Sequence, residues 1–579
     1  MQQFVFLIMF IQMSPSRRFF FFSIFLLTLY SCVNHSQRIP LKGKISEKAM
    51  VSSAHPLASA IGLEIMKKGG NAIDAAIATH FALSVVYPQA GNIGGGGFAV
   101  IRLDDGTIAS LDFREKAPGL ADRDMYLDTN GTLNLKQWST HGNLASGVPG
   151  VVDGMFRLHD KFGSLPMSEL IQPSIDLAKN GYALTALAAD ILNINQDEFQ
   201  QQNRWSIPYL SDQPWQKGDI IQQPDLARTL TRIQLQGRRG FYEGKTADQI
   251  VAEMKSENGI ITHSDLKNYK SIWRKPIIGY YRGHQIISMG PPSSGGIALM
   301  QLLQGTANYP IANWGHNSAK TIHLMTELER RVYADRATYL GDPAFVNIPI
   351  EELLDSVYNQ RRYEGISFDK ATPSALVSAG EIPLNESPET THLSVVDGHG
   401  NAVSITTTLN SSFGNKVMVQ GAGFFLNNEM DDFSSKPGTP NLYGLIGGEA
   451  NAIAPNKRML SSMTPTIVTY NDKLKMVLGT PGGSTIITSV YQTLLNVIDH
   501  GMGMQEAVNA KRVHHQWYPD EIRVETDALS NSTQAQLEDL GHRLRMTDKI
   551  GRMDCILVLP DGRLEGGADP RGDNTALGY

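Results

Sequence analysis

Cysteine is almost absent from this 579-residue chain, which contains only Cys32 and Cys555. Two thiols are too few for a thiolate metal cluster. No intrachain disulfide can form once Cys32 has been removed or lipidated. An exported protein of this length without disulfides suggests a bacterial periplasm or cell surface.

The chain also lacks an excess of positive charge, since its formal net charge is -6. No stripe of Lys and Arg with interleaved aromatics is present, so nucleic acid is not expected as a partner. No cluster of ligands typical of a metal site appears, and His514 and His515 are expected in a structural turn. The sequence therefore predicts neither a metal nor an organic cofactor.

Long hydrophobic runs are missing except at the N-terminus, where Arg17 and Arg18 precede "FFFFSIFLLTLYSC". The apolar run of about 12 residues is too short to span a bilayer and is typical of a secretory signal. We predict a signal peptide over residues 1–32, with Met13 as an alternative start to Met1. "LYSC" resembles a bacterial lipoprotein cleavage site, which makes Cys32 a candidate for lipidation. The alternative is an ordinary cleaved signal with an incidental cysteine.

These features predict an exported protein, periplasmic or lipid-anchored at the bacterial cell envelope. Membrane attachment is expected only through the N-terminal lipid.

The rest of the chain changes from helical to strand-like texture. A polar linker over 33–47 is followed by two helices within 55–89, the second capped by Asn71 with Asp74 in its first turn. The middle, roughly 150–380, is mostly helical in pattern. Strands are then predicted at 391–397, 401–409, 417–426, 464–470 and 474–479, with a helical pair near 485–511 and 533–541 before the final strands. Neither half has a complete sheet pattern, so we expect two segments folded together in one sandwich.

Four consecutive glycines, Gly94 to Gly97, lead into a predicted strand at 98–102. A phosphate-binding loop usually precedes a helix and carries Lys followed by Ser or Thr, both absent here. We therefore expect these glycines to permit close backbone packing.

A polar connector over 361–388 is followed by "TTHLSVVDGHGNAVSITTTLNSSFG", which begins at Thr390 and reads as a hairpin. A threonine hydroxyl needs a neighbouring base to act as a nucleophile. Cleavage before Thr390 would supply its own α-amine, with an unperturbed pKa near 8. The alternative is that Thr390 is simply a strand-forming residue, and the local pattern leaves both interpretations open.

The hairpin sequence closely resembles that of the γ-glutamyltransferase (γ-glutamyltranspeptidase) family. The resemblance extends from about residue 45 to Tyr579. It is carried by further motifs in the same order: "GNIGGGGF", "FREKAP", "YADRATYLGDP", "NNEMDDFS", "PNKRMLSSMTPT", "GTPGGS" and "HHQWYPDE".

This resemblance implies an N-terminal nucleophile hydrolase with an α+β, four-layer αββα sandwich. Such a precursor cuts itself, here between Glu389 and Thr390. The products would be a large subunit, 33–389, and a small catalytic subunit, 390–579, which stay associated as a heterodimer.

The family's chemistry implies that Thr390 forms a γ-glutamyl-enzyme from glutathione or another γ-glutamyl amide. The γ-glutamyl group then passes to water or to an amino acid or dipeptide acceptor. Thr408 is expected to position Thr390, and the N–H groups of Gly482 and Gly483 to form an oxyanion hole.

The γ-glutamyl group carries both a carboxylate and an ammonium. The resemblance assigns Arg114, Ser461 and Ser462 to the carboxylate, with the Arg114 fork suited to bidentate contact. It assigns Asn410, Glu429 and Asp432 to the ammonium, on the opposite side of the ligand. A lid loop is expected over 435–453, with Tyr443 as its gating aromatic.

Two other functions remain open from the sequence. A cephalosporin acylase of the same fold takes glutaryl-like groups, which have no ammonium for Glu429 and Asp432 to bind. A non-catalytic surface lipoprotein would keep the fold as a binding module, which the retained Thr390 and Thr408 argue against.

Overall fold

The computed structural model describes residues 42–133, 138–380, 391–436, 439, 441 and 448–579. The predicted signal peptide, Cys32, the cleavage site at Glu389 and Thr390, and Tyr443 lie outside the described residues.

Two seven-stranded antiparallel sheets form the centre of the fold. The first has the strand order β19 (Thr575–Gly578), β2 (Met50–Ser53), β10 (Thr391–Val396), β11 (Ala402–Thr408), β3 (Gly96–Arg102), β4 (Ile108–Asp112) and β7 (Ile272–Arg274). The second has the order β1 (Lys44–Ser46), β18 (Leu564–Ala568), β17 (Asp554–Val558), β13 (Lys473–Leu478), β12 (Thr466–Tyr470), β9 (His284–Ser288) and β8 (Ile277–Tyr281).

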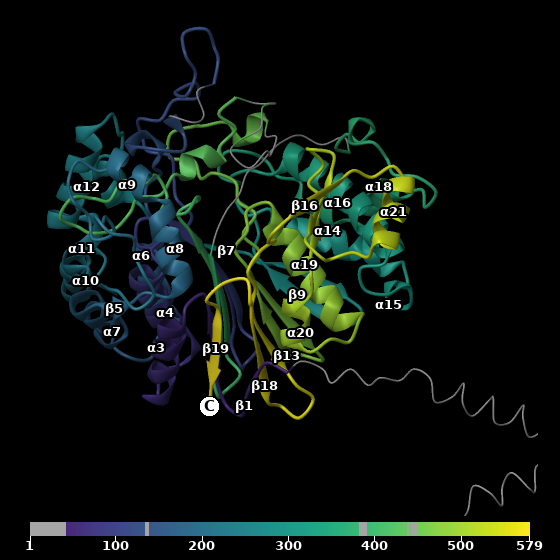
Figure 1. Ribbon diagram of the computed structural model, residues 1–579, viewed down its shortest axis with the longest axis horizontal. Coiled ribbons are helices and arrows are strands. Elements are labelled where there is room, and N and C mark those ends of the chain that lie inside the picture. The colour runs from purple at the N-terminus through teal and green to yellow at the C-terminus, as the bar shows by residue number, and fades with distance from the viewer. Residues whose placement is uncertain (1–41, 134–137, 381–390, 437–438, 440, 442–447) are drawn as a thin grey trace, which may run out of the picture. The chain divides into compact units, whose positions relative to one another are not determined.

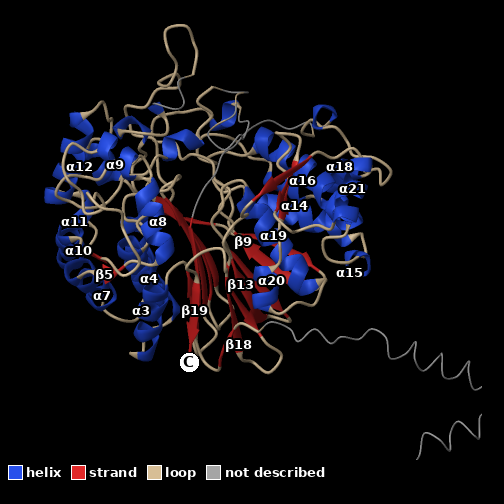
Figure 2. Ribbon diagram, in the orientation of Figure 1, coloured by secondary structure: helices blue, strands red, loops and turns tan. Residues whose placement is uncertain are grey.

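Helices cover the outer face of each sheet, which gives four layers (Figures 1 and 2). The first sheet packs against α3 (Pro56–Lys67) and α4 (Ala72–Val86), and the second against α14 (Gly295–Ala307) and α20 (Met504–Asn509). Helix α19 (Thr485–Ile498) packs against α14 and α20. A dry core between the sheets includes Phe98, Met289, Ile467 and Ile556, all fully buried. The predicted αββα sandwich is confirmed, because apolar faces of both sheets are buried against each other and against helices.

The remaining elements extend these layers. Beyond α4 the helices are α6 (Val151–Phe162), α7 (Met167–Asn180), α8 (Ala186–Ile194), α9 (Gln196–Gln202), α10 (Pro224–Gln236), α11 (Arg239–Tyr242), α12 (Gly244–Ser256) and α13 (His263–Asn268). Around α14 they are α15 (Ile311–Trp314), α16 (Ala319–Tyr339), α17 (Ile350–Leu354), α18 (Ser356–Tyr363) and α21 (Asn531–Asp539). Smaller sheets pair β5 (Tyr182–Ala183) with β6 (Ile220–Ile221), and join β14 (Val513–His514), β15 (Ile522–Glu525) and β16 (Leu544–Thr547).

Both sheets combine strands from the two sides of residue 390. In the first sheet, β10 pairs with β2, and β11 pairs with β3. In the second, β12 pairs with β9, and β18 pairs with β1. The expectation that the two segments fold together is therefore confirmed.

Local sequence signals located several elements well. The two N-terminal helices are present, and Asn71 and Asp74 form a reciprocal capping box at the start of α4. Strands β10 to β13 match their predicted ranges closely, since their alternating or buried patterns persist along each strand.

The strand predicted at 417–426 is wrong. Gly421 and Gly423 adopt positive φ angles of 70° and 78°, which reverse the chain. Val419 N–H consequently donates to the carbonyl of Phe424, and one bridge joins Met418 to Phe425.

Two further predictions need correction, for the linker and for His514. Strand β1 lies within the predicted linker. The middle segment is mostly helical, as predicted, but it also contains the short strands β7, β8 and β9. His514 belongs to the short strand β14. Strands β1, β7 and β9 are stabilised by pairing with the distant strands β18, β4 and β12, which local pattern does not report. Strand β8 pairs with the adjacent β9, and β14 with the nearby β15.

Among the described helices, none combines the length and the apolar character needed to cross a membrane.

Candidate active site

The hairpin β10–β11 lies in the middle of the first sheet, and every residue of both strands is buried. Asp397 closes its turn, because its carboxylate accepts hydrogen bonds from the backbone N–H groups of His399 and Asn401. In the register of the hairpin, Thr391 faces Thr407. Thr408, the last residue of β11, therefore lies at the same end of the hairpin as the start of β10.

The glycine run packs tightly against this end. A Cβ atom on Gly95 would lie 1.9 Å from the carbonyl oxygen of Thr408, and one on Gly96 would lie 2.5 Å from Oε2 of Glu115. Only glycine permits backbones to approach this closely. The predicted packing role of the glycine run is confirmed.

His392 is part of the structure of the hairpin. Its ring nitrogens are 3.0 Å from the hydroxyls of Thr406 and Ser394. Burial lowers the pKa of His392 to about 3, so its imidazole is neutral. Both nitrogens are engaged, and His392 is therefore not available as a general base.

Arg114 is the centre of a buried ionic cluster. Its Nη1 lies 2.6 Å from Oε2 of Glu429 and 3.4 Å from Oε2 of Glu115, and its Nη2 bonds to Asp432. All four side chains are completely buried. The structure thus brings Arg114 into direct contact with the two acids, Glu429 and Asp432, that the sequence analysis assigned to the opposite side of the ligand.

Three acids surround Arg114, and one of them, Asp432, also interacts electrostatically with Arg336. Burial raises the pKa of Glu115 to about 7, against the lowering effect of Arg114. Burial likewise raises the pKa of Glu429 well above its ordinary value, with Arg114 again opposing. Burial disfavours the charge on Arg114, but Glu429, Asp432 and Glu115 together raise its pKa. The cluster therefore favours an additional positive charge or proton.

Thr408 connects this cluster to the hairpin. Its hydroxyl donates to Oε1 of Glu429 over 2.7 Å and accepts from the N–H of Asn410 over 2.7 Å. Glu429 and Asp432 are positioned by a short 3-10 helix, Glu429–Asp432. One hydroxyl thus fixes the end of β11 relative to the acids.

Asn410 has an unusual backbone, with a φ of 71°. Its side-chain N–H donates to the carbonyl of Asn428, while its buried Oδ1 has no hydrogen-bond partner among the described residues. A buried acceptor without a donor is costly, so this oxygen is suited to receive a ligand N–H.

Ser461 and Ser462 are fully buried beside Arg114, whose Nη2 donates to the carbonyl of Leu460 over 3.2 Å. The Ser462 hydroxyl bonds to Arg336, whose Nε donates to Ser294 over 3.0 Å. Burial lowers the pKa of Arg336 to about 9, with Tyr333 and Asp432 raising it.

Arg336 was missed by the sequence analysis as a residue of this region. It lies within "YADRATYLGDP", a motif that carried the family resemblance, so the motif itself was the available signal.

Gly482 and Gly483 precede α19 and have φ angles of 142° and 61°. Their carbonyls accept from Thr485 and Ile486, but within the described chain neither glycine N–H donates a hydrogen bond. Two adjacent free N–H groups at the start of a 14-residue helix are suited to stabilising an anion.

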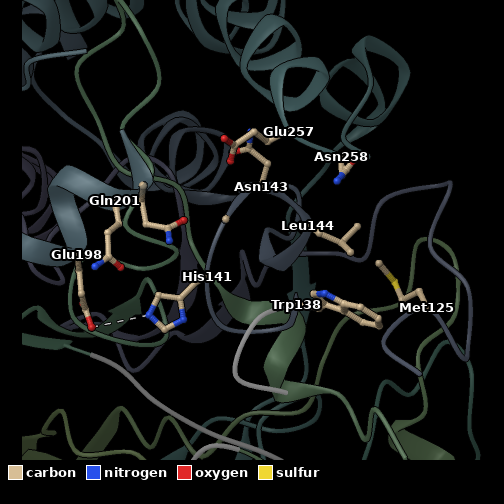
Figure 3. A pocket seen from close by; sticks show the side chains of 11 residues that line it. Met125, Trp138, His141, Asn143, Leu144, Glu198, Gln201, Glu257 and Asn258 are labelled. Atoms are coloured by element: carbon tan, nitrogen blue, oxygen red, sulfur yellow. Dashed lines mark ion pairs between the residues drawn. The ribbon is translucent and has the colours of Figure 1, made fainter. Parts of the chain in front are cut away.

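Gly482 and Asn410 line one cavity of about 360 Å³. The larger cavity of about 900 Å³ lies elsewhere and contains none of the predicted site residues. Figure 3 shows Trp138 and His141 in it, with His141 3.9 Å from Glu198. Ser139, which follows the cavity residue Trp138, donates to Asp431 over 2.7 Å. This hydrogen bond links the cavity wall to the 3-10 helix Glu429–Asp432.

Comparison with known proteins gives consistent results. A sequence model of the family described as Gamma-glutamyltranspeptidase matches residues 58–579. The chain is 45% identical over 537 residues to the glutathione hydrolase proenzyme of Escherichia coli (strain K12), which covers 92% of each protein. It is 47% identical over 546 residues to the glutathione hydrolase proenzyme of Pseudomonas sp. (strain A14), covering 92% of this chain and 95% of the relative. The crystal structure of cephalosporin acylase from Bacillus halodurans matches with a TM-score of 0.82 and 26% identity, covering 94% of this chain and 98% of that chain.

Two facing antiparallel sheets between helical layers, with a candidate oxyanion site at the end of the central hairpin, define an N-terminal nucleophile hydrolase. Within this class, the family match over 58–579 and the identities of 45% and 47% distinguish one branch. The chain belongs to the γ-glutamyltranspeptidase family, and it is an enzyme of the hydrolase and transferase type.

Proposed function

We propose that this protein is a γ-glutamyltransferase and glutathione hydrolase that matures by cutting itself before Thr390. The observation that carries the proposal is the buried Arg114 cluster, which Thr408 connects to the end of the central hairpin. A cation and a set of acids in one desolvated site are the groups needed to recognise a free amino acid end. The glutathione hydrolase proenzymes, at 45% and 47% identity, support the substrate class.

In the proposed reaction, the Thr390 hydroxyl attacks the γ-carbonyl carbon of the substrate, and the freed α-amine of Thr390 accepts the hydroxyl proton. The carbonyl oxygen becomes an oxyanion, for which the free N–H groups of Gly482 and Gly483 are suited donors. Collapse of this intermediate expels the leaving amine, which takes the proton. Water or an acceptor amine then releases the γ-glutamyl group.

Recognition of the γ-glutamyl group involves rearranging existing ion pairs. In the proposal, the ammonium binds Glu429, Asp432 and the open Oδ1 of Asn410. Glu429 and Asp432 then form ion pairs with the ligand ammonium. The Arg114 guanidinium moves to bind the ligand carboxylate, which also accepts hydrogen bonds from Ser461 and Ser462. Burial raises the pKa of Glu429 well above its ordinary value, and a ligand ammonium beside it would favour its charged form.

Glutaryl acylase activity is the alternative within the same fold, supported by the match to cephalosporin acylase. A glutaryl group would leave Glu429 and Asp432 without a ligand cation, although both are completely buried. Both acids pair with Arg114, and a glutaryl carboxylate that drew Arg114 away would weaken this pairing without supplying a cation. Weakening the pairing of buried acids is costly, so the cluster favours a substrate with an ammonium.

The proposal also includes a signal peptide over 1–32, a large subunit over 33–389 and a small subunit over 390–579. We further propose that the protein is exported, with Cys32 as a candidate for lipidation. Tyr443 is proposed to gate the site, and the proposed acceptors are amino acids and dipeptides.

The deciding experiment combines intact mass spectrometry with hydrolysis of γ-glutamyl-p-nitroanilide. We expect two chains from the wild type, the smaller starting at Thr390, and release of p-nitroaniline. Thr390→Ala should remain one chain and be inactive, whereas Thr391→Ala serves as the neighbouring control and should still be cut. A wild type that stays uncut and inactive would overturn the proposal and favour the binding-module function.

A further inference from the structure

The cavity of about 360 Å³ beside Gly482 and Asn410 has a strongly positive lining. Its described lining residues include Lys549, Arg552 and Arg571, and no Asp or Glu. None of Arg114, Glu429 and Asp432 lines it. The cavity therefore adjoins the proposed ammonium site at Asn410 and the candidate oxyanion site at Gly482, and its lining does not include the ionic cluster around Arg114.

Among the described residues, Arg571 is the one of these three cations that forms ion pairs with neighbouring acids. Arg571 lies 2.5 Å from Oε2 of Glu525 and 3.0 Å from Oδ1 of Asp569. Lys549 is exposed and donates to the carbonyl of Arg571 over 2.9 Å. That hydrogen bond holds Lys549 at the cavity and leaves its charge uncompensated.

Arg552 is half-buried, and in the described part of the chain no carboxylate lies within ion-pair distance of it. Its guanidinium lies 5.7 Å from the ring centre of Tyr87, which orients the side chain. Asp554 interacts electrostatically with Arg552, but burial raises the pKa of Asp554 well above its ordinary value. The two carboxylate oxygens of Asp554 accept from other groups, the Ser52 hydroxyl over 3.1 Å and the Asn574 side-chain N–H over 2.7 Å, and not from Arg552.

We propose that Lys549 and Arg552 form a subsite for the carboxylate of the acceptor, and of the leaving group when that group is a peptide. This inference rests on the proposed function, since it concerns what occupies the site on the leaving side of the γ-carbonyl. Two uncompensated cations in a small cavity next to Gly482 select an amine that also carries a carboxylate. Amino acids and short peptides have this chemistry.

The lining of the cavity also includes Leu187 and Ile191, both on α8. Aliphatic side chains can contact the side chain of a bound acceptor while its carboxylate contacts the cations. The subsite thus favours a zwitterionic acceptor with an apolar side chain.

The transfer step balances without a further reactant. The acceptor nitrogen forms a bond to the acyl carbon as the ester bond to Thr390 Oγ breaks. The proton lost by the nitrogen ends on Thr390 Oγ, which restores the hydroxyl. The subsite carboxylate takes no part in bond making, so its role is to orient the amine.

The test compares two acceptors, glycylglycine and glycylglycine amide, with γ-glutamyl-p-nitroanilide as the donor. The donor's leaving group is uncharged, so release of p-nitroaniline reports acyl-enzyme formation independently of the subsite. We expect the kcat/KM of the wild type for glycylglycine to exceed that for glycylglycine amide by roughly 10-fold or more. One charge-assisted contact to the carboxylate is worth about 1.4 kcal/mol or more.

Arg552→Gln and Lys549→Gln should each reduce this preference several-fold, and the double variant should bring it close to one. Lys473→Gln removes an exposed cation on β13 and should keep the wild-type preference. Equal use of both acceptors by an active wild type would overturn the subsite alone, as would a double variant with the wild-type preference. A wild type that releases no p-nitroaniline would overturn the proposed function together with the subsite.

Discussion

At the scale of single residues, Thr408 connects the end of β11 to the buried ionic cluster around Arg114. Its hydroxyl accepts from Asn410 and donates to Glu429, so it fixes two other proposed ligand-binding groups at once. Its function therefore depends on a donor and an acceptor in one hydroxyl, which valine lacks and serine retains.

We expect Thr408→Val to lower kcat by roughly 10- to 100-fold, since a lost buried hydrogen bond costs about 1–3 kcal/mol. Hydrolysis of γ-glutamyl-p-nitroanilide measures this effect, and mass spectrometry shows whether maturation is also slowed. Thr408→Ser is the matched control and should keep most of the activity. Equal rates for the valine and serine variants would contradict a role for the hydroxyl.

Arg114 contacts three acids with one planar fork. Arg114→Lys keeps the charge but not the fork, so we expect KM for γ-glutamyl-p-nitroanilide to rise roughly 10-fold or more. Arg563→Lys changes an exposed pair with Asp561 in the same way and should leave KM unaltered. An unchanged KM in Arg114→Lys would remove Arg114 from the list of ligand-binding residues.

At the scale of elements, the glycine run brings β3 against β11 and thereby fixes Glu115 beside Arg114. The pKa of Glu115 is raised by burial to about 7, so the folded protein binds its proton more tightly than the unfolded chain does. This contribution is fully present below about pH 4.5 and is lost as the pH rises through 7, by up to about 3 kcal/mol.

Glu115→Gln cannot ionise, so its stability relative to the parent protein should increase between pH 5 and pH 8. The measurement is the thermal midpoint across this range, made in the uncut Thr390→Ala precursor so that unfolding involves one chain. Glu169→Gln, an exposed change on α7, should parallel its parent at every pH. Parallel curves for Glu115→Gln would show that Glu115 is not the titrating group.

The elements also show what could be predicted from the sequence. Helices α3 and α4 were identified because Asn71, Asp74 and the glycines between the helices act locally. The reversal at Gly421 was missed because the positive φ angles of Gly421 and Gly423 interrupt a strand-like pattern. Strands β7 and β9 were missed because they pair with the distant strands β4 and β12. The motif resemblance indicated Arg114, Glu429 and Asp432 as a set. It did not indicate their direct ion pairing, which arises because the fold brings the 3-10 helix Glu429–Asp432 to Arg114, just after β4.

At the scale of the whole molecule, the two segments divided at residue 390 contribute strands to both sheets. Separating them would expose the core between the sheets and break the ladders β10–β2 and β12–β9. The proposed heterodimer is therefore expected to be obligate.

We expect the processed protein to keep the mass of both chains in size-exclusion chromatography and native mass spectrometry. Residues 390–579 produced alone should fail to fold, because four strands of the first sheet, β2, β3, β4 and β7, come from the other segment. A soluble, cooperatively folded fragment 390–579 would show that the sheets do not depend on each other in this way.

The interleaving of strands also makes maturation a one-way event. Before the cut, every long-range strand pair forms within one chain, and folding is unimolecular. After the cut, an unfolded molecule can recover only if two chains meet, so recovery depends on concentration and competes with aggregation. Because of this strand order, the covalent connection in the uncut chain makes folding easier. Once the chain is cut, the lifetime of the mature protein is set by how slowly it unfolds.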